Sequence, residues 1–275
     1  MNQGSSIQKV PQRRLIQQRF DVRPLIVVGH QRRPVRLRAQ RRHAGACSLA
    51  LACACLAAAA GAEPQLSPAS SAAEAGLVDI AALVPDAIVD MRYAGGNNFV
   101  GQRIDGYHAP RCYLLKPAAL ALQRVAEALR EKRLRLQIFD CYRPARAVRH
   151  FVEWAADPDD QQMKAAFYPE VDKSELLGVY IAPVSGHSRG ATVDLTLARC
   201  GGERCAELDM GTSYDYFDEL AHTAAPSIEA DQRRNRDLLR TAMEREGYRN
   251  YELEWWHYTL HPEPSPDTIY DVPVR

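Results

Sequence analysis

Hydrophobic residues recur with helical spacing in three segments of the chain. Residues 116–129 open with Lys-Pro, a typical helix start, and continue with apolar side chains at i, i+3, i+4 and i+7. Residues 144–155 also open with a proline, and their apolar side chains fall on one face of a helix of about three turns. A third helix is expected over 231–246, where Gly247 ends it. The pattern therefore predicts three amphipathic helices.

Strict alternation of apolar and polar residues marks two strands. Residues 133–140 alternate Leu, Leu and Ile with polar side chains, and residues 191–197 alternate again. Between 90 and 112, repeated Gly, Asn and Asp residues predict loops and short strands. The order of elements has no regular βαβ rhythm and no internal repeat. We therefore expect an α+β fold, a single compact domain with a central, mainly antiparallel sheet flanked by helices.

Charge is distributed unevenly along the chain. Residues 1–43 contain ten arginines and Lys9 against the single acid Asp21, which gives +10 and leaves −9 for the other 232 of the 275 residues. An apolar, Ala-rich run over 44–61 follows, and Ala60-Gly61-Ala62 forms an A-x-A site. This order is typical of a secretory signal peptide.

We therefore divide the chain into a basic region with signal peptide (1–62), a Pro/Ser/Ala-rich linker (63–76) and a globular domain (77–275). The basic region is longer than a signal requires, so it is either an extended n-region or translation from too early a start. The expected location is periplasmic or otherwise exported. It is cytoplasmic if the apolar run is not a functional signal. After signal removal, no stable membrane span is expected.

Four cysteines remain beyond the signal peptide: Cys112, Cys141, Cys200 and Cys205. An even number in an exported chain is compatible with two disulfides. Cys200 and Cys205 are the better local candidate, because two glycines between them let a short loop close. The sequence leaves open whether Cys112 pairs with Cys141. The part of the chain after the signal has no basic stripe, so no nucleic acid partner is expected.

The first cluster of chemistry lies in the segment Ser185-Gly186-His187-Ser188-Arg189-Gly190, which leads into a predicted strand containing Asp194. An aspartate in the middle of a strand is unfavourable unless a cation or a similar partner offsets the cost. His187 and Asp194 are therefore candidate metal ligands. The alternative is a histidine in a turn and an aspartate that caps backbone groups.

A second cluster places Glu254 three residues before His257 in an aromatic segment. His257 would be a third zinc ligand, leaving the open fourth position that a catalytic zinc needs for water. Glu254 would then be the general base. Residues three apart on a regular strand face opposite sides, so this interpretation requires a bend between Glu254 and His257. The alternative is an aromatic core strand with one hydrogen-bonded histidine.

A third candidate is Arg143, at the end of the strand predicted over 133–140 and just before a proline. The proline favours an extended conformation for this arginine. Its place at a strand end makes it a candidate to stabilise an oxyanion. A surface arginine is the alternative.

Together these motifs resemble the VanX-type D-alanyl-D-alanine dipeptidases, zinc peptidases related to the D,D-carboxypeptidases and to the zinc-bearing hedgehog signalling domain. The resemblance runs from about Asp90 to the C-terminus. Its motifs are Arg92-Tyr93-Ala94, Asn98-Phe99, Asp105-Gly106-Tyr107, Asp140-x-Tyr142-Arg143-Pro144, Ser185-x-His187-Ser188-Arg189-Gly190, Asp194-Leu195-Thr196-Leu197, Met210-Gly211-Thr212-x-Tyr214-Asp215 and Glu254-Trp255-Trp256-His257-Tyr258.

The resemblance implies one zinc ion per chain, bound in a cleft on the sheet. It implies these roles: His187, Asp194 and His257 as zinc ligands, Glu254 as the acid/base, Arg143 as the transition-state stabiliser, and Tyr93, Ser185 and Asp215 as lining of the substrate pocket. Asp215 would bind the free amino group of a dipeptide. Cys141 departs from the family, because a small residue such as glycine is usual there.

The expected function is zinc-dependent hydrolysis of the D-Ala-D-Ala dipeptide, in cell-wall peptide turnover or in glycopeptide resistance. A D,D-carboxypeptidase is one alternative. It would need an open cleft where residues 150–180 or 199–225 otherwise form a lid. A zinc-stabilised binding module is the other, although such a module would not require both Glu254 and Arg143. The expected partner is a small dipeptide substrate, and the oligomeric state is not readable from the sequence.

Overall fold

A six-stranded sheet forms the centre of the computed structural model, which describes residues 64–201 and 204–275. The order along the sheet is β3-β5-β6-β9-β8, and β7 also pairs with β6. The strands are β3 (Ile88–Val89), β5 (Leu134–Asp140), β6 (Thr192–Gly201), β7 (Arg204–Glu207), β8 (Tyr248–Asn250) and β9 (His257–Leu260). Among the strand pairs of this sheet, β3 and β5 are parallel and the other pairs are antiparallel. The predicted α+β fold with a mainly antiparallel sheet is confirmed. The basic region and signal peptide expected over 1–62 lie outside the described residues.

The two strands predicted from alternation, β5 and β6, are neighbours at the centre of this sheet. Their register places Leu136 opposite Leu197 and Ile138 opposite Leu195, so apolar side chains from both strands meet on one face. Every residue of β6 from Thr192 to Ala198 is buried, because both faces of the sheet are covered there. A carboxylate on β6 is therefore shielded from solvent.

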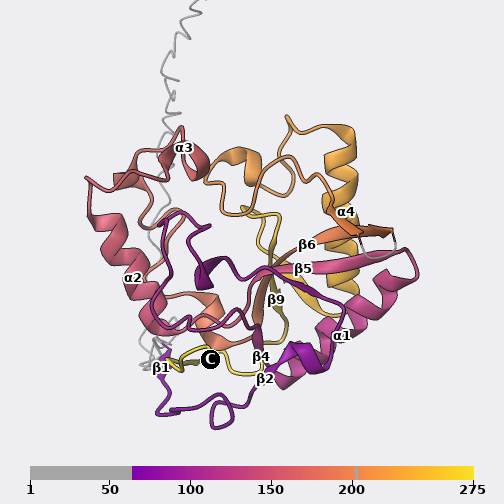
Figure 1. Cartoon of the computed structure of the whole chain (residues 1–275), viewed down its shortest axis with the longest axis horizontal. Helices are drawn as coiled ribbons and strands as arrows, with labels where there is room; N and C mark the ends of the chain where they lie inside the picture. The colour runs from indigo at the N-terminus through magenta and orange to yellow at the C-terminus, as the bar shows by residue number, and fades with distance from the viewer. Residues whose placement is uncertain (1–63, 202–203) are drawn as a thin grey trace, which may run out of the picture. The chain divides into compact units, whose positions relative to one another are not determined.

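The three predicted helices are present, and two of them cover one face of the sheet. α1 (Lys116–Arg130) packs on β5 and on α4 (Ala230–Arg245), and α4 packs on β8 and β6. Gly247 follows α4 with φ 88°, the left-handed conformation that favours glycine. α2 (Ala145–Ala156) and the short α3 (Lys164–Phe167) lie on the other side of β5, β6 and β9 in Figure 1. The core lies between these layers.

Short elements complete the fold. β2 (Leu77–Asp79) pairs with β4 (Tyr113–Leu115), and β1 (Gln65–Leu66) pairs with β10 (Thr268–Ile269). The 3-10 helices are η1 (Ile80–Ala82), η2 (Arg92–Ala94), η3 (Lys173–Glu175), η4 (Gly186–Arg189) and η5 (Glu219–Ala221). Within the segment expected as a linker, 63–76, the short strand β1 pairs with β10 near the C-terminus. Its backbone hydrogen-bonds to Asp267 and Ile269 near the C-terminus, which ties it to the domain.

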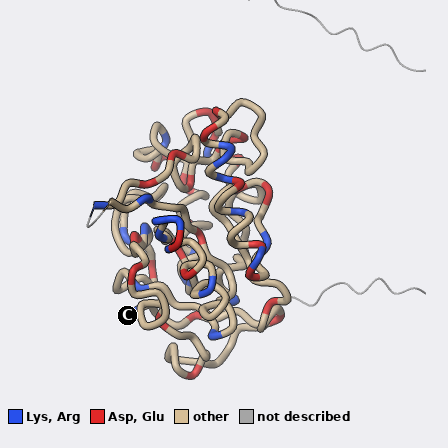
Figure 2. The backbone as a smooth tube through the Cα atoms, turned by 90° about the vertical axis from the view of Figure 1, so that its right-hand side faces the viewer, with Lys and Arg blue, Asp and Glu red and all other residues tan. Residues whose placement is uncertain are grey.

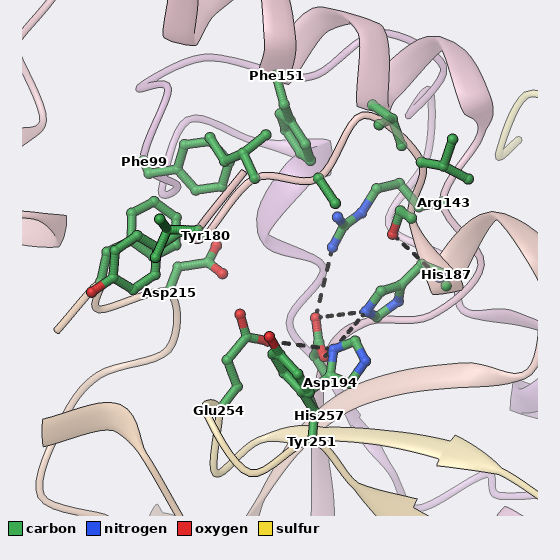
Figure 3. Close-up of a pocket in the computed structure, with 18 of the residues that line it drawn as sticks. Phe99, Arg143, Phe151, Tyr180, His187, Asp194, Asp215, Tyr251, Glu254 and His257 are labelled. Carbon is green, nitrogen blue, oxygen red and sulfur yellow. Dashed lines mark hydrogen bonds and ion pairs between the residues drawn. The ribbon is translucent and has the colours of Figure 1, made fainter. Parts of the chain in front are cut away.

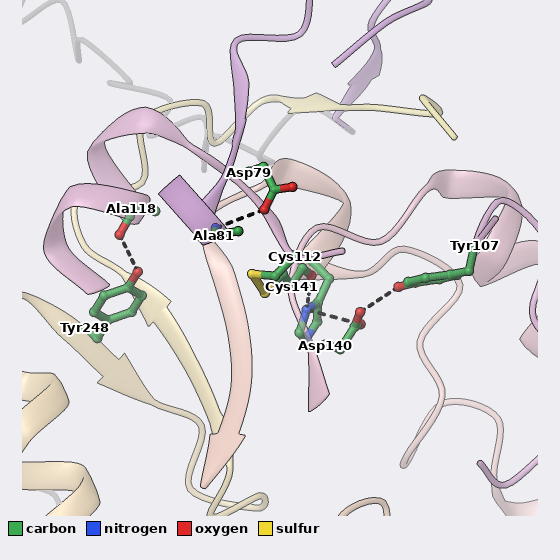
Figure 4. The surroundings of a disulfide bond; sticks show 9 residues. Asp79, Ala81, Tyr107, Cys112, Ala118, Asp140, Cys141 and Tyr248 are labelled. Carbon is green, nitrogen blue, oxygen red and sulfur yellow. Dashed lines mark hydrogen bonds and ion pairs between the residues drawn. A yellow bond between two sulfur atoms is a disulfide. The ribbon is translucent and has the colours of Figure 1, made fainter. Parts of the chain in front are cut away.

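Two disulfides are present. One joins Cys112, just before β4, to Cys141, just after β5, and the other joins Cys200 to Cys205 between β6 and β7 (Figure 4 shows the first). The first lies in the core, since Cys112 is 1% exposed and Cys141 is fully buried. The pairing that the sequence left open is therefore Cys112 with Cys141.

Basic and acidic residues are interspersed along the described backbone (Figure 2). None of the helices in residues 64–201 and 204–275 has the length and apolar character needed to cross a membrane.

A buried arginine on α4 binds the segment from Met210 to His222, which follows β7 and includes η5. Arg236 is 1% exposed and donates hydrogen bonds to three backbone carbonyls, those of Met210 (2.6 Å), His222 (2.6 Å) and Leu220 (2.9 Å). No carboxylate of the described residues forms an ion pair with it. The guanidinium therefore serves as a hydrogen-bond donor to the chain segment that leads to and from residue 215.

We expect Arg236→Met to lower the free energy of unfolding by about 3 kcal/mol, because it leaves three inward-facing carbonyls without donors. Urea denaturation of the full chain measures this. The matched control is Arg240→Met, one turn further along α4, where the side chain is 44% exposed and pairs only with Asp237. Its expected change is below about 0.5 kcal/mol. Equal effects of the two substitutions would contradict the account of Arg236.

Candidate metal centre and substrate pocket

Two histidines and an aspartate, the three predicted metal ligands, converge in the structure. Asp194 on β6 and His257 at the start of β9 are directly opposite each other in the antiparallel ladder. His187 comes from η4, which precedes β6. One potential ligand atom from each of the three side chains lies within 4.8 Å of the others. The sheet register and the η4 turn thus build a three-residue cluster.

The atoms that face one another in this cluster are ones that coordinate metals. Nε2 of His187 lies 3.2 Å from Oδ2 of Asp194, and Nδ1 of His257 lies 3.1 Å from Oδ1 of Asp194. The two ring nitrogens are 3.3 Å apart. Oδ1 of Asp194 is buried and accepts no hydrogen bond from the described residues. Two imidazole nitrogens and a carboxylate oxygen around one point fit Zn²⁺.

Neighbouring groups fix the orientation of these ligands. Nδ1 of His187 donates a hydrogen bond of 2.7 Å to the backbone carbonyl of Cys141, which leaves the lone pair of Nε2 directed at Asp194. The Tyr214 hydroxyl donates to Oδ2 of Asp194 at 3.0 Å. Burial would raise the pKa of Asp194, but the two adjacent histidines hold it well below its usual range. The aspartate is therefore a carboxylate ready to bind a cation.

Glu254 approaches the cluster from a turn. β9 begins only at His257, and the His257 N–H donates to the Glu254 carbonyl at 3.3 Å, which closes the turn between them. This is the bend that the sequence interpretation required, and the alternative of a continuous aromatic strand is wrong. Trp255 and Trp256 lie buried within the turn.

The carboxylate of Glu254 is placed to exchange a proton near the cluster. Its Oε2 lies 3.4 Å from Nδ1 of His257, and the side chain is 19% exposed. Burial raises the pKa of Glu254 to about 7. A carboxylate with a pKa near neutrality is well matched to accepting and returning a proton.

Arg143 is held rigidly beside the same cluster. Its Nε and Nη2 each lie 2.9 Å from Oδ2 of Asp140, and Nη2 is 3.8 Å from Oδ2 of Asp194. The guanidinium stacks over the rings of Tyr93 and Phe151 at 5.0 and 5.1 Å. Its side chain is 13% exposed, so the alternative of a surface arginine is wrong.

The three candidate ligands, Glu254 and Arg143 line one pocket of about 350 Å³ (Figure 3). The eight residues predicted from the sequence are all on its wall: Tyr93, Arg143, Ser185, His187, Asp194, Asp215, Glu254 and His257. In Figure 3, Arg143, Asp215 and Glu254 point toward the same central space. The sequence motifs thus come from distant parts of the chain but meet in one cavity.

Asp215 supplies a second carboxylate away from the metal ligands. Its backbone has φ 58°, a left-handed conformation rare for residues other than glycine, and the Tyr93 hydroxyl donates to its Oδ2 at 2.8 Å. Burial and the nearby charge of Asp194 raise the pKa of Asp215 well above its usual range. An ammonium group bound against Asp215 would offset this penalty.

Ser185 has a structural role as well as a place on the wall. Its hydroxyl accepts a hydrogen bond of 3.2 Å from the His187 backbone N–H and caps η4. Arg189, on the same turn, donates to both carboxylate oxygens of Glu263 at 2.6 and 2.8 Å. Arg189 therefore braces the turn.

Several wall residues were not identified from the sequence. Tyr180 and Phe217 stack with ring centroids 5.1 Å apart, and Tyr251 forms another part of the wall. Tyr180 and Phe217 lie in two different loops, and no periodic sequence pattern indicates that these loops meet. They belong to 150–180 and 199–225, the two segments that the sequence offered as a lid. Asp140 was quoted as part of a motif, but nothing in its spacing indicated that it holds Arg143.

Comparisons with known proteins give one consistent result. A family model, Peptidase_M15, described as D-ala-D-ala dipeptidase, matches residues 73–275. Three similar proteins are each named D-alanyl-D-alanine dipeptidase. The Enterococcus faecium protein is 40% identical over 188 residues, covering 68% of this chain and 92% of its own length. The Streptomyces coelicolor protein is 42% identical (67% and 91%), and the Escherichia coli protein is 35% identical (67% and 84%).

We expect His187→Ala to abolish tight zinc binding, because it removes one of the three candidate ligands. Metal analysis of the purified full chain after dialysis against zinc-free buffer measures this. His108→Ala is the control, since His108 is exposed and lies outside the pocket. Zinc retained equally by both variants would show that the cluster is not the metal site.

Proposed function

Because the chain belongs to the Peptidase_M15 family of D-Ala-D-Ala dipeptidases, we propose that it hydrolyses the dipeptide D-alanyl-D-alanine to D-alanine with the help of a bound zinc ion. One observation carries the proposal. Glu254 and Arg143 both face the cluster of His187, Asp194 and His257 inside a single pocket. A group that moves protons and a group that stabilises negative charge thus lie beside a candidate metal centre.

The zinc ligands in this proposal are His187 and Asp194 together with His257. When bound, zinc lowers the pKa of a coordinated water to about 7 and polarises the substrate carbonyl. The Cys141 carbonyl and the Tyr214 hydroxyl keep His187 and Asp194 in place for this task. These contacts preorganise the ligands before metal arrives.

Glu254 is the acid/base of the reaction. Its carboxylate accepts a proton from the attacking water and passes it to the amine that leaves when the peptide bond breaks. The raised pKa, about 7, suits both halves of this transfer near neutral pH.

Arg143 stabilises the negative charge that develops on the attacked carbonyl oxygen. Asp140 and the two aromatic rings hold the guanidinium in one orientation, so little reorganisation is needed when the charge appears. Loss of one such donor typically reduces the rate by about 10²–10³.

Asp215 and Tyr93 recognise the free amino terminus of the dipeptide. The Asp215 carboxylate supplies the negative charge, and the Tyr93 hydroxyl fixes one of its oxygens. Ser185 lines the pocket next to His187 and offers a hydroxyl to the substrate. A short substrate with a charge at each end is suited to a small pocket with few, well-placed polar groups.

The other functions suggested by the sequence have less support. The relatives compared above are named dipeptidases, which favours the dipeptide over the longer peptides of a D,D-carboxypeptidase. A zinc-stabilised binding module would have no use for Glu254 and Arg143 in the same pocket.

The proposed place of action is outside the cytoplasm. The basic region, the apolar run and the A-x-A site over 1–62 support export, and the two disulfides are typical of an oxidising compartment. An exported enzyme would act on dipeptide released during cell-wall turnover. A chain retained in the cytoplasm would instead deplete a dipeptide precursor and contribute to glycopeptide resistance.

We expect Glu254→Gln to lower kcat by about 10²–10⁴-fold while zinc stays bound, because the amide cannot accept the proton but the metal ligands are unchanged. D-alanine release from D-Ala-D-Ala, measured alongside zinc content, tests this. Glu252→Gln is the matched control, two residues earlier and with an exposed side chain outside the pocket. Full turnover by Glu254→Gln would exclude it as the base.

A further inference from the structure

The Cys112–Cys141 disulfide lies directly behind a candidate zinc ligand. The carbonyl of Cys141 itself accepts the 2.7 Å hydrogen bond from Nδ1 of His187. The preceding residue, Asp140, holds Arg143 and lies 3.6 Å from the same His187 nitrogen. One short piece of backbone therefore supports both a metal ligand and the proposed oxyanion stabiliser.

Within this piece of backbone, Cys141 lies just beyond the end of the sheet. β5 ends at Asp140, and its pairing with β6 becomes irregular between Ile138 and Asp140. Beyond that point, the regular ladder that would fix the carbonyl direction of Cys141 has ended. The support must come from other contacts.

The segment around β4 provides that support. The Tyr142 N–H donates to the Tyr113 carbonyl at 2.9 Å, and the Leu115 N–H donates to the Gly190 carbonyl, at the end of η4, at 2.8 Å. Cys112 is anchored in turn, because its carbonyl accepts from the Ile80 N–H at 3.0 Å. The disulfide joins this anchored segment covalently to Cys141 (Figure 4).

We propose that the Cys112–Cys141 disulfide is a positioning element of the metal centre, which fixes the Cys141 carbonyl and through it the His187 ring. This inference rests on the proposed zinc site. Zinc affinity then depends on the disulfide, and the chain binds zinc more weakly when the two thiols are free. The metal centre would therefore bind zinc most tightly in an oxidising compartment, where the disulfide forms.

The second disulfide provides a matched control. Cys200 and Cys205 close the β6–β7 hairpin, and neither residue lines the pocket. Cys200 is six residues along β6 from Asp194, roughly 20 Å at the usual rise of a strand. Its removal takes away a cross-link of the same chemical kind without touching the zinc ligands.

The experiment compares the double variants C112A/C141A and C200A/C205A with the wild-type full chain, produced under oxidising conditions. Zinc Kd is measured by competition with a chromogenic chelator, and folding of the metal-free forms by circular dichroism. We expect C112A/C141A to raise the zinc Kd about 10–100-fold, the usual effect of losing support behind a metal ligand. At saturating zinc its kcat returns toward the wild-type value, and C200A/C205A leaves the Kd unchanged.

A second measurement avoids substitution altogether. The wild-type chain is reduced with a phosphine, the free thiols are counted by alkylation, and the zinc Kd is measured again, with the same rise expected. The zinc titration is independent of D-alanine release, so zinc binding without dipeptide cleavage would refute the proposed reaction and not this inference.

Two outcomes would overturn the inference. An unchanged zinc Kd in folded C112A/C141A or in the reduced wild-type chain would show that the disulfide does not position His187. Loss of the fold in both would show that it is needed for folding rather than for placing the ligand.

Discussion

The carboxylate of Asp194, buried in the middle of the central sheet, is the constraint on which the rest of the site depends. A buried charge is costly unless charged or hydrogen-bonding groups surround it. β9 supplies His257 directly across the ladder and η4 supplies His187, and the Tyr214 hydroxyl donates to Oδ2, the oxygen that faces His187. The sheet register and the η4 turn that precedes β6 are therefore arranged around one side chain.

From this centre the charges of the pocket follow a simple arrangement. Arg143 lies between Asp140 and Asp194. Its positive charge therefore interacts both with Asp140, which holds it in place, and with Asp194, a candidate metal ligand. Burial raises the pKa of Glu254 and of Asp215. The raised pKa of Glu254 suits proton transfer, whereas Asp215 would need a bound cation, such as an ammonium group, to offset the cost of its buried charge. The geometry supports hydrolysis of a short peptide with a free amine better than it supports a purely structural metal site.

Local patterns in the sequence were sufficient for the main helices and for the two central strands, and they singled out the side chains that form the candidate metal cluster, but they did not give the contacts between distant segments. The helices from 116, 144 and 231 and the strands β5 and β6 each have their own periodicity, and all are present. The interpretation of Glu254 and His257 as parts of one site required a bend between them, and the structure has a turn there.

What the sequence missed depends on how loops meet in space. Tyr180 and Phe217 form one wall of the pocket although they are far apart in the chain and carry no shared pattern. The support that Asp140 gives Arg143 depends on where β5 ends, and the pairing of Cys112 with Cys141 depends on where β4 begins and β5 ends. Such contacts are set by packing of the whole domain, which local spacing does not encode.

The most direct test of the central claim is release of D-alanine from D-Ala-D-Ala by the purified chain, measured before and after zinc removal with a chelator. A pentapeptide ending in D-Ala-D-Ala serves as the comparison substrate. The account predicts rapid cleavage of the dipeptide, loss of activity on chelation, recovery on adding zinc, and little cleavage of the pentapeptide. Cleavage of the dipeptide that is unaffected by metal removal, or no cleavage by zinc-loaded protein, would contradict it.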